Sequence, residues 1–137
     1  MGERVRPARG IVDTSVLIDL DELDAAALPV EIAVSVVTMA ELAAGPHATA
    51  DPGERARRQD RLQRAEAAFD PLPLDADAAR AYGRIYAAVV GTGRTARGAR
   101  AVDLLMAATA CSEGLPLYTR NPEDFRGLDG LLEIVAV

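Results

Sequence analysis

The chain contains no lysine, one histidine, His47, and one cysteine, Cys111. Without lysine it can have neither a Walker A phosphate loop nor a Schiff-base lysine, and one histidine excludes a metal site built from several imidazoles. One cysteine excludes an internal disulfide and a zinc site made of cysteine pairs, and its apolar helical surroundings favour a buried thiol in a reducing compartment. The chemistry left to this sequence is that of carboxylates and arginines.

Aromatic residues and long apolar runs are also scarce. The 137 residues include two Phe, three Tyr and no Trp, and half of them are hydrophobic. No apolar stretch approaches the ~18 residues of a membrane span, and the first ten residues, with four charged side chains, lack the apolar core of a signal peptide. We therefore expect one α/β domain over residues 1–137, with a cytoplasmic location and no contact with a membrane.

The net charge is −6, and every positive charge comes from arginine. The arginines are concentrated at residues 55–64 and 94–100. The acidic balance argues against a general nucleic-acid binder, so local patches must make any contact with phosphate. Arg57, Arg61 and Arg64 recur at helical spacing and predict one positive helix face. The alternative is a solvated face, paired with Glu54, Asp60 and Glu66.

Short apolar runs alternate with helical patterns along the chain. This alternation predicts crossover connections and a mainly parallel sheet of four to five strands, with helices on both faces. We expect strands at residues 10–13, 32–37, 115–118 and 132–137. We expect helices at residues 16–20, from a cap at Thr38 to Gly45, at 52–69, from a cap at Asp75 to Gly91, at 101–112, and one turn after Pro122.

Four acidic residues stand where an apolar run stops, and a carboxylate there is costly unless something positive meets it. They are Asp13, Glu41, Asp103 and Asp124. In open parallel sheets such positions gather beyond the carboxyl ends of the strands, so the acids would repel one another unless they shared a hard divalent cation. The alternative for each acid alone is a helix cap or a solvated side chain, and Glu41 would then be the capping-box partner of Thr38.

Other polar residues fall near the same edge and are candidates for contact with substrate. Thr14, Ser15 and Thr119 can donate a hydroxyl to a carboxylate or to bound water, with ordinary N-capping as the alternative. Arg94, Arg97 and Arg100 form a basic loop that leads into the segment carrying Asp103, and arginine is suited to holding phosphate.

Four segments together resemble the PIN domain of the VapC toxin family, in order and in spacing. They are IVDTSVLI at residues 11–18, AEL at 40–42 with Gly45, DLLMAATA at 103–110, and LYTRN at 117–121 with Asp124 and Phe125. The resemblance runs from about residue 10 to 137. Two departures are the long arginine-rich segment before Asp103 and Tyr118, where an aliphatic residue is expected.

The resemblance implies a PIN fold and an endoribonuclease that depends on Mg²⁺ or Mn²⁺. It also implies the toxin of a type II toxin–antitoxin pair, blocked by a VapB-like antitoxin. By position, Asp13 and Asp103 would be direct metal ligands, while Glu41 and Asp124 would act through water or help to hold a second ion. Whether one ion or two bind is left open.

The inventory also limits the mechanism and its competitors. Without a usable histidine or lysine, bound metal must lower the pKa of water to make the nucleophile and must stabilise charge on the phosphate. An aspartyl-phosphate phosphatase or receiver domain also places an acid after its first strand, but it needs a lysine. A PIN-like RNA-processing module that binds without cutting is the non-toxin alternative. Apolar helix faces near residues 16–20 and 85–89 lead us to expect a homodimer.

Overall fold

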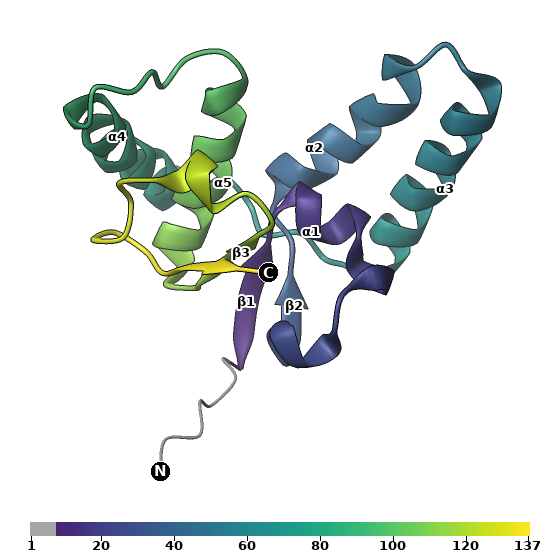
Figure 1. Ribbon diagram of the computed structural model, residues 1–137, viewed down its shortest axis with the longest axis horizontal. Coiled ribbons are helices and arrows are strands. Elements are labelled where there is room, and N and C mark those ends of the chain that lie inside the picture. Colours follow the sequence, from purple (N-terminus) through teal and green to yellow (C-terminus); the bar gives the residue numbers. More distant parts are fainter. Residues whose placement is uncertain (1–7) are drawn as a thin grey trace.

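The protein has one parallel sheet with helices packed on both sides of it, as seen in a computed structural model that describes residues 8–137 except for the side chain of Ala99. The strand order is β2-β1-β3-β4, and every pairing is parallel (Figure 1). The predicted α/β class with a mainly parallel sheet is confirmed. The strands are β1 (Arg9–Val12), β2 (Glu31–Ala33), β3 (Leu117–Thr119) and β4 (Ile134–Ala136).

Helices follow the strands as the alternating pattern predicts. The α-helices are α1 (Thr14–Ile18), α2 (Val36–Ala44), α3 (Pro52–Ala68), α4 (Ala76–Gly91) and α5 (Ala99–Glu113). Short 3-10 helices are η1 (Leu20–Glu22), η2 (Ala25–Ala27), η3 (Gly45–Ala48) and η4 (Pro122–Phe125). In the described part of the chain, no helix is long and apolar enough to cross a membrane.

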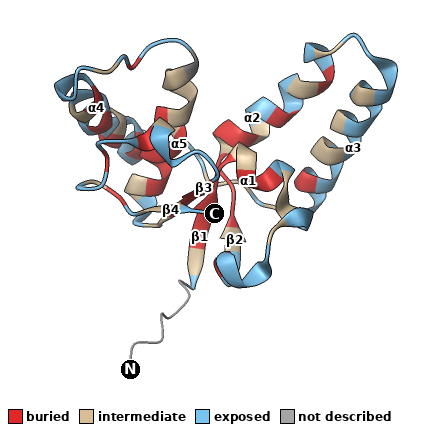
Figure 2. Cartoon of the chain, in the orientation of Figure 1, coloured by how far each residue is buried: buried red, intermediate tan, exposed pale blue. Residues whose placement is uncertain are grey.

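Alternate residues of the strands face two separate cores. Ile11 and Leu117 pack with α4, α5 and η4, whereas Val12 and Tyr118 pack with α1, α2 and α3. Buried residues accordingly concentrate where the strands meet the helices, and much of α3 is exposed (Figure 2). Gly10 is required beneath Tyr118, because a Cβ there would lie 2.6 Å from Tyr118 Cε1. The tyrosine that departs from the family pattern is therefore accommodated by a neighbouring glycine.

The end of β2 and the start of α2 differ from the prediction. β2 ends at Ala33, not at residue 37, because the next residues leave the sheet and pair with Leu72. Leu72 N donates to Val34 O at 2.8 Å, and Val36 N donates to Leu72 O at 2.9 Å. Ser35 caps α2 by accepting a hydrogen bond from Thr38 N at 3.1 Å. The expectation that Thr38 is the cap and Glu41 its capping-box partner is therefore wrong.

Two other helix starts also differ from the prediction. Asp13 itself caps α1, so the proposed capping role of Thr14 or Ser15 there is wrong. α5 starts two residues earlier than predicted, after Gly98 at a φ of +69°, and ends as predicted at Gly114 in the left-handed conformation. The earlier start places Arg100 in the first turn of α5, with Asp103 in the next turn.

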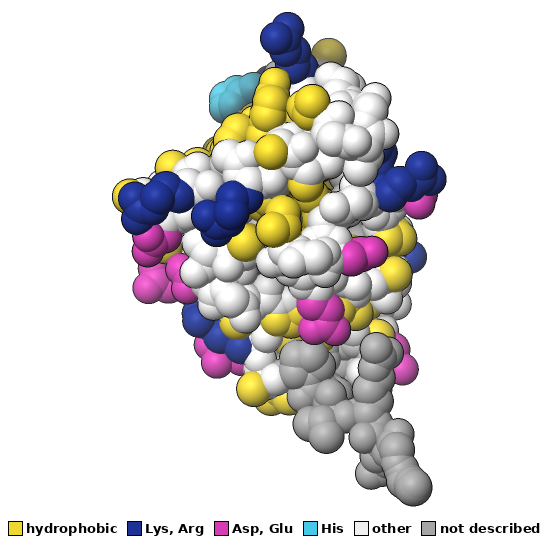
Figure 3. Space-filling model, turned by 90° about the vertical axis from the view of Figure 1, so that its left-hand side faces the viewer, with side chains coloured by type: hydrophobic (Ala, Val, Ile, Leu, Met, Phe, Trp, Pro, Cys, Tyr) yellow, Lys and Arg dark blue, Asp and Glu magenta, His cyan; other side chains and the backbone are white. Residues whose placement is uncertain are grey.

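The helix faces on which we based a homodimer belong largely to the chain's own core. Val16, Leu17, Ile85 and Val89 are buried, because each sheet face requires an apolar cover. Residues 16–20 and 85–89 thus do not offer the wide free faces that we expected. The large apolar side chains exposed on these two helices are Ile18, Tyr86 and Val90, and Figure 3 shows hydrophobic side chains between charged ones on the side where α4 lies.

Candidate active site

The four predicted acids come from four elements that converge at the carboxyl edge of the sheet. Asp13 follows β1, Glu41 lies on α2, Asp103 on α5, and Asp124 on η4 after β3. The pKa of Asp103 is raised to about 6, first by burial and then by the negative charges of Asp124, Glu41 and Asp13, against an opposing effect of Arg100. Each of the other three acids thus repels Asp103, as expected of one shared negative site.

Asp13 is held in place by the fold. Its side chain is 5% exposed, and its Oδ1 accepts hydrogen bonds from Val16 N at 3.1 Å and from Ser15 Oγ at 2.5 Å. Its backbone N donates to Tyr118 O at 3.0 Å, which joins the end of β1 to β3. Oδ2 accepts no hydrogen bond from the described residues, so one oxygen serves the helix cap and the other remains available.

Glu41 is exposed but has a hydroxyl partner. Thr14 Oγ1 donates to Glu41 Oε1 and lies 3.2 Å from Thr38 Oγ1. Thr38 Oγ1 in turn lies 3.2 Å from Met106 Sδ. Since Thr38 is three residues before Glu41 on α2 and Met106 three after Asp103 on α5, this buried contact connects the helices that carry two of the acids.

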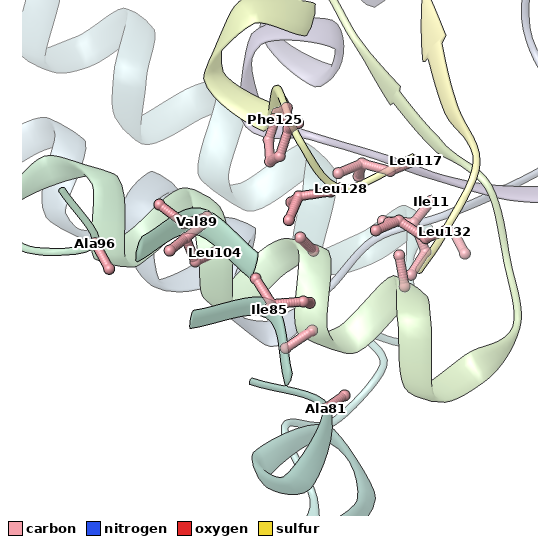
Figure 4. Close-up of a cluster of buried hydrophobic side chains, with 14 residues drawn as sticks. Ile11, Ala81, Ile85, Val89, Ala96, Leu104, Leu117, Phe125, Leu128 and Leu132 are labelled. Atoms are coloured by element: carbon pink, nitrogen blue, oxygen red, sulfur yellow. The ribbon is translucent and has the colours of Figure 1, made fainter. Parts of the chain in front are cut away.

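Asp103 is placed by the apolar helix on which it lies. The next residue, Leu104, is fully buried and belongs to the cluster that contains Val89 and Phe125 (Figure 4). Phe125 also directly follows Asp124, so the same core fixes η4 against α5. The Asp103 side chain is half-buried and accepts no hydrogen bond from the described residues. Of the charges that act on Asp103 from the described residues, that of Arg100 favours its charged form and those of Asp124, Glu41 and Asp13 oppose it.

The arginines of the basic loop are partly tied to η4. Arg100 Nη1 donates to Asp124 O at 2.6 Å, and Arg94 Nη1 donates to Glu123 O at 2.9 Å. Arg97 is exposed, and its guanidinium has no hydrogen-bond or ion-pair partner in the described part of the chain. Two of the three predicted arginines therefore hold the segment of Asp124 in place, and Arg97 stands free.

The three predicted hydroxyl residues have different positions. Thr14 and Ser15 bond to Glu41 and Asp13, respectively, which agrees with the idea that they donate to carboxylates. Thr119 is fully buried and its Oγ1 accepts from Asn121 N at 2.9 Å. In this arrangement Thr119 supports the turn after β3 and does not present its hydroxyl to solvent.

The donors at this edge suit a hard cation. The available groups are carboxylate and hydroxyl oxygens, which Mg²⁺ and Mn²⁺ prefer, and there is no nearby thiol or imidazole. Among the described residues, no three His, Cys, Asp or Glu side chains are closed around a common point. The unneutralised repulsion on Asp103 is nevertheless what a divalent cation would relieve.

Comparisons with known proteins identify the family of this chain. The sequence model of the PIN domain matches residues 10–131. The chain belongs to the PIN-domain family. It is 40% identical to ribonuclease VapC5 of Mycobacterium tuberculosis over 136 residues, which cover 96% of this chain and 97% of that protein. The predicted family resemblance is confirmed.

Solved structures show the same PIN fold. The crystal structure of VapBC-5, a member of the VapBC family of toxin–antitoxin systems from Mycobacterium tuberculosis, is 41% identical and matches with a TM-score of 0.84. The match covers 96% of this chain and all of that one. VapBC2 from Rickettsia felis, bound to a promoter DNA fragment, matches with a TM-score of 0.72 at 20% identity, over 94% of this chain and 98% of that one. The second similarity supports the fold only.

Sequence reasoning missed two residues of this PIN domain that support the acids. Thr38 and Met106 are buried side by side behind Glu41 and Asp103. The signal was available, since Thr38 precedes Glu41 and Met106 follows Asp103 by three residues, which is one helical turn in each case. Interpreting Thr38 as a cap concealed it.

Proposed function

We propose that this PIN domain is an Mg²⁺- or Mn²⁺-dependent endoribonuclease that acts as the toxin of a type II toxin–antitoxin pair. The observation that carries the proposal is the convergence of four carboxylates, in which Asp103 is repelled by the other three. The relative with 40% identity is named a ribonuclease, and it matches this chain over nearly its whole length.

Asp13, through its available Oδ2, and Asp103 would hold the metal, with Glu41 and Asp124 completing the acidic edge. When bound, the ion supplies a water of lowered pKa and stabilises charge on the phosphate. Ser15 and the amide of Val16 keep Asp13 oriented. Thr14 orients Glu41 in the same way. Whether the edge takes one ion or two is a matter for metal titration.

RNA would reach the acids past the basic loop. Arg97 offers a free guanidinium for phosphate, while Arg94 and Arg100 retain N–H groups beyond those bonded to η4. These contacts would offset the repulsion between an RNA chain and a protein of net charge −6. We include all three arginines in the proposed substrate site.

The partner we propose is a VapB-like antitoxin that covers the acidic edge. VapBC-5, at 41% identity, is a member of a family of toxin–antitoxin systems. We also propose a homodimer, with Tyr86 and Val90 of α4, 37% and 50% exposed, as its apolar contact. Light scattering at tens of micromolar should give the mass of two chains, and Val90→Asp should reduce it to one.

The direct test is cleavage of RNA by the purified chain. Wild-type protein with millimolar Mn²⁺ should cut RNA internally, whereas EDTA or the Asp103→Asn substitution should prevent it. Protein that binds RNA in Mn²⁺ but never cuts it would instead support the alternative of a PIN-like binding module. A neighbouring reading frame that encodes a small DNA-binding protein would support the toxin assignment.

A further inference from the structure

The arginines of α3 do not form one uniform positive face. Arg57 donates to Glu54 Oε2 from Nε at 3.0 Å and from Nη2 at 2.8 Å. Arg58 Nε donates to Glu54 Oε1 at 3.1 Å, and Arg64 Nη2 lies 2.8 Å from Asp60 Oδ2. Arg61 has no hydrogen-bond or ion-pair partner among the described residues. The alternative of a solvated face with paired charges is therefore correct for the arginines around Arg61, but not for Arg61 itself.

The sequence explains why Arg61 stands apart. Side chains three and four residues apart are neighbours on a helix surface. For Arg61 these neighbours are Arg57, Arg58, Arg64 and Ala65. No acid occupies any of the four positions, and three of them repel a guanidinium. The helix thus presents Arg61 without a local counter-ion.

Arg61 also faces the candidate active site. A hollow of about 320 Å³ lies beside the acidic edge, and its wall includes Thr14, Glu41 and Arg61. Arg58 and Glu54 share this wall but are bonded to each other, and hydrogen bonds from Arg57 and Arg58 lower the pKa of Glu54. Among the described residues that line this hollow, Arg61 is therefore the cation without a partner.

The helix that carries Arg61 is fixed to its neighbour. Arg55 donates from Nε to Pro46 O at 3.1 Å and from Nη2 to Thr49 O at 3.0 Å. Arg58 Nη1 donates to Gly45 O at 2.9 Å. These bonds attach α3 to η3, which directly follows the helix of Glu41. The separation of Arg61 from Glu41 is consequently set by a tied helical hairpin.

We propose that Arg61 binds a phosphate of the RNA strand that flanks the scissile one, with the hollow as the subsite for that nucleotide. The inference rests on the proposed ribonuclease function and deepens it. A polyanion that approaches four carboxylates needs a cation close by, and guanidinium binds phosphate with two parallel hydrogen bonds. Ile18 and Leu42 line the same hollow and offer apolar contact to the sugar or base.

The test compares Arg61→Gln with Arg64→Gln, its matched control one turn away on the same helix. Arg64 is paired with Asp60 and does not line the hollow beside Glu41. For Arg61→Gln, we expect the KM for RNA to rise about tenfold and the slope of log affinity against log salt to fall by about 0.7. kcat and the stabilisation by Mn²⁺ should not change. Arg64→Gln should resemble wild type, and Arg61→Lys should retain the salt slope.

Equal KM values and salt slopes for Arg61→Gln and wild type would overturn the inference, as would an identical defect in Arg64→Gln. Arg61 and Arg64 also border a second hollow, whose wall includes Asp21 and apolar side chains such as Leu17. If Arg61→Gln weakens binding of an acidic peptide but leaves RNA affinity intact, the site serves a protein partner and the inference fails. RNA affinity is measured by binding as well as by cleavage. A wild-type chain that does not cut RNA would thus contradict the proposed function without deciding the role of Arg61.

Discussion

Two aspartates lie at the same acidic edge but have different surroundings: Asp13 directly follows β1, and Asp103 lies on α5. Asp13 is 5% exposed and accepts hydrogen bonds from Val16 N and Ser15 Oγ. Asp103 is half-buried, accepts no hydrogen bond from the described residues and is repelled by three other acids. The two carboxylates thus differ in whether the fold supplies hydrogen-bond donors, which favour the charged form of a buried acid.

The largest expected effect is on catalysis, where the two aspartates should behave alike. Asp13→Asn and Asp103→Asn each replace a charged oxygen by a neutral one in a site without spare donors. RNA cleavage in Mn²⁺ should fall by more than the roughly 10–100-fold lost when a residue that only supports a ligand is removed. Carefully purified variants that still cleave at the wild-type rate would refute a metal role for these residues.

A bound metal ion should stabilise the folded chain through both Asp13 and Asp103. An ion that binds only the folded state at one hundred times its dissociation constant stabilises it by ~2.7 kcal/mol. Wild-type protein should therefore melt at a higher temperature in Mn²⁺ than in EDTA, and Asp103→Asn should lose this shift. A melting curve that ignores millimolar Mn²⁺ would speak against a preformed site.

Without metal, Asp103→Asn should stabilise the chain. The pKa of Asp103 is raised to about 6 from 3.8, so the folded state takes up the proton first as pH falls. The penalty from this group is absent below about pH 4, grows as the pH rises from 4 to 6, and is complete above 6. Because solvent screens a half-exposed side chain, we expect a gain of about 1–2 kcal/mol at pH 7.5. Urea unfolding in EDTA should show that the free energies of unfolding of variant and wild type approach each other as the pH falls towards 4.

The smallest expected effect distinguishes the two oxygens of Asp13. Asn is as good an N-cap as Asp, whereas Ala loses the cap at a cost of about 1 kcal/mol. Asp13→Asn should consequently unfold at nearly the wild-type urea concentration and Asp13→Ala at a lower one, with both inactive. Equal stability of the Asn and Ala variants would show that Oδ1 does not serve as a cap.

The parts of this architecture that depend on local pattern were predictable from the sequence. The alternation of apolar runs and helices gave the parallel sheet, and acids at the ends of those runs marked Asp13, Glu41, Asp103 and Asp124. Helix starts were predicted less well, because Ser35 and Thr38 are both good caps and only the pairing of Val34 and Val36 with Leu72 selects between them. A contact between residues 36 and 72 has no local signal.

Long-range pairing also decided which side chains were free. Residues 16–20 and 85–89 look like surplus apolar surface until the sheet is present to cover them. The partners of Arg94 and Arg100 are backbone oxygens of η4, more than twenty residues away. Arg61 is the opposite case, because its lack of a counter-ion follows from the four residues around it on the helix.

The position of β1 between β2 and β3 sets the order in which the site can form during synthesis. Asp13 N donates a hydrogen bond to Tyr118 O. The backbone at Asp13 is therefore fixed by β3, which is synthesised more than a hundred residues later. At about 5–20 residues per second, the ribosome needs roughly 6–22 s to proceed from Asp13 to Asp124. Throughout that interval the nascent chain lacks a complete acidic edge. With the proposed site, the nuclease would stay inactive towards RNA near its ribosome until Asp124 has been added.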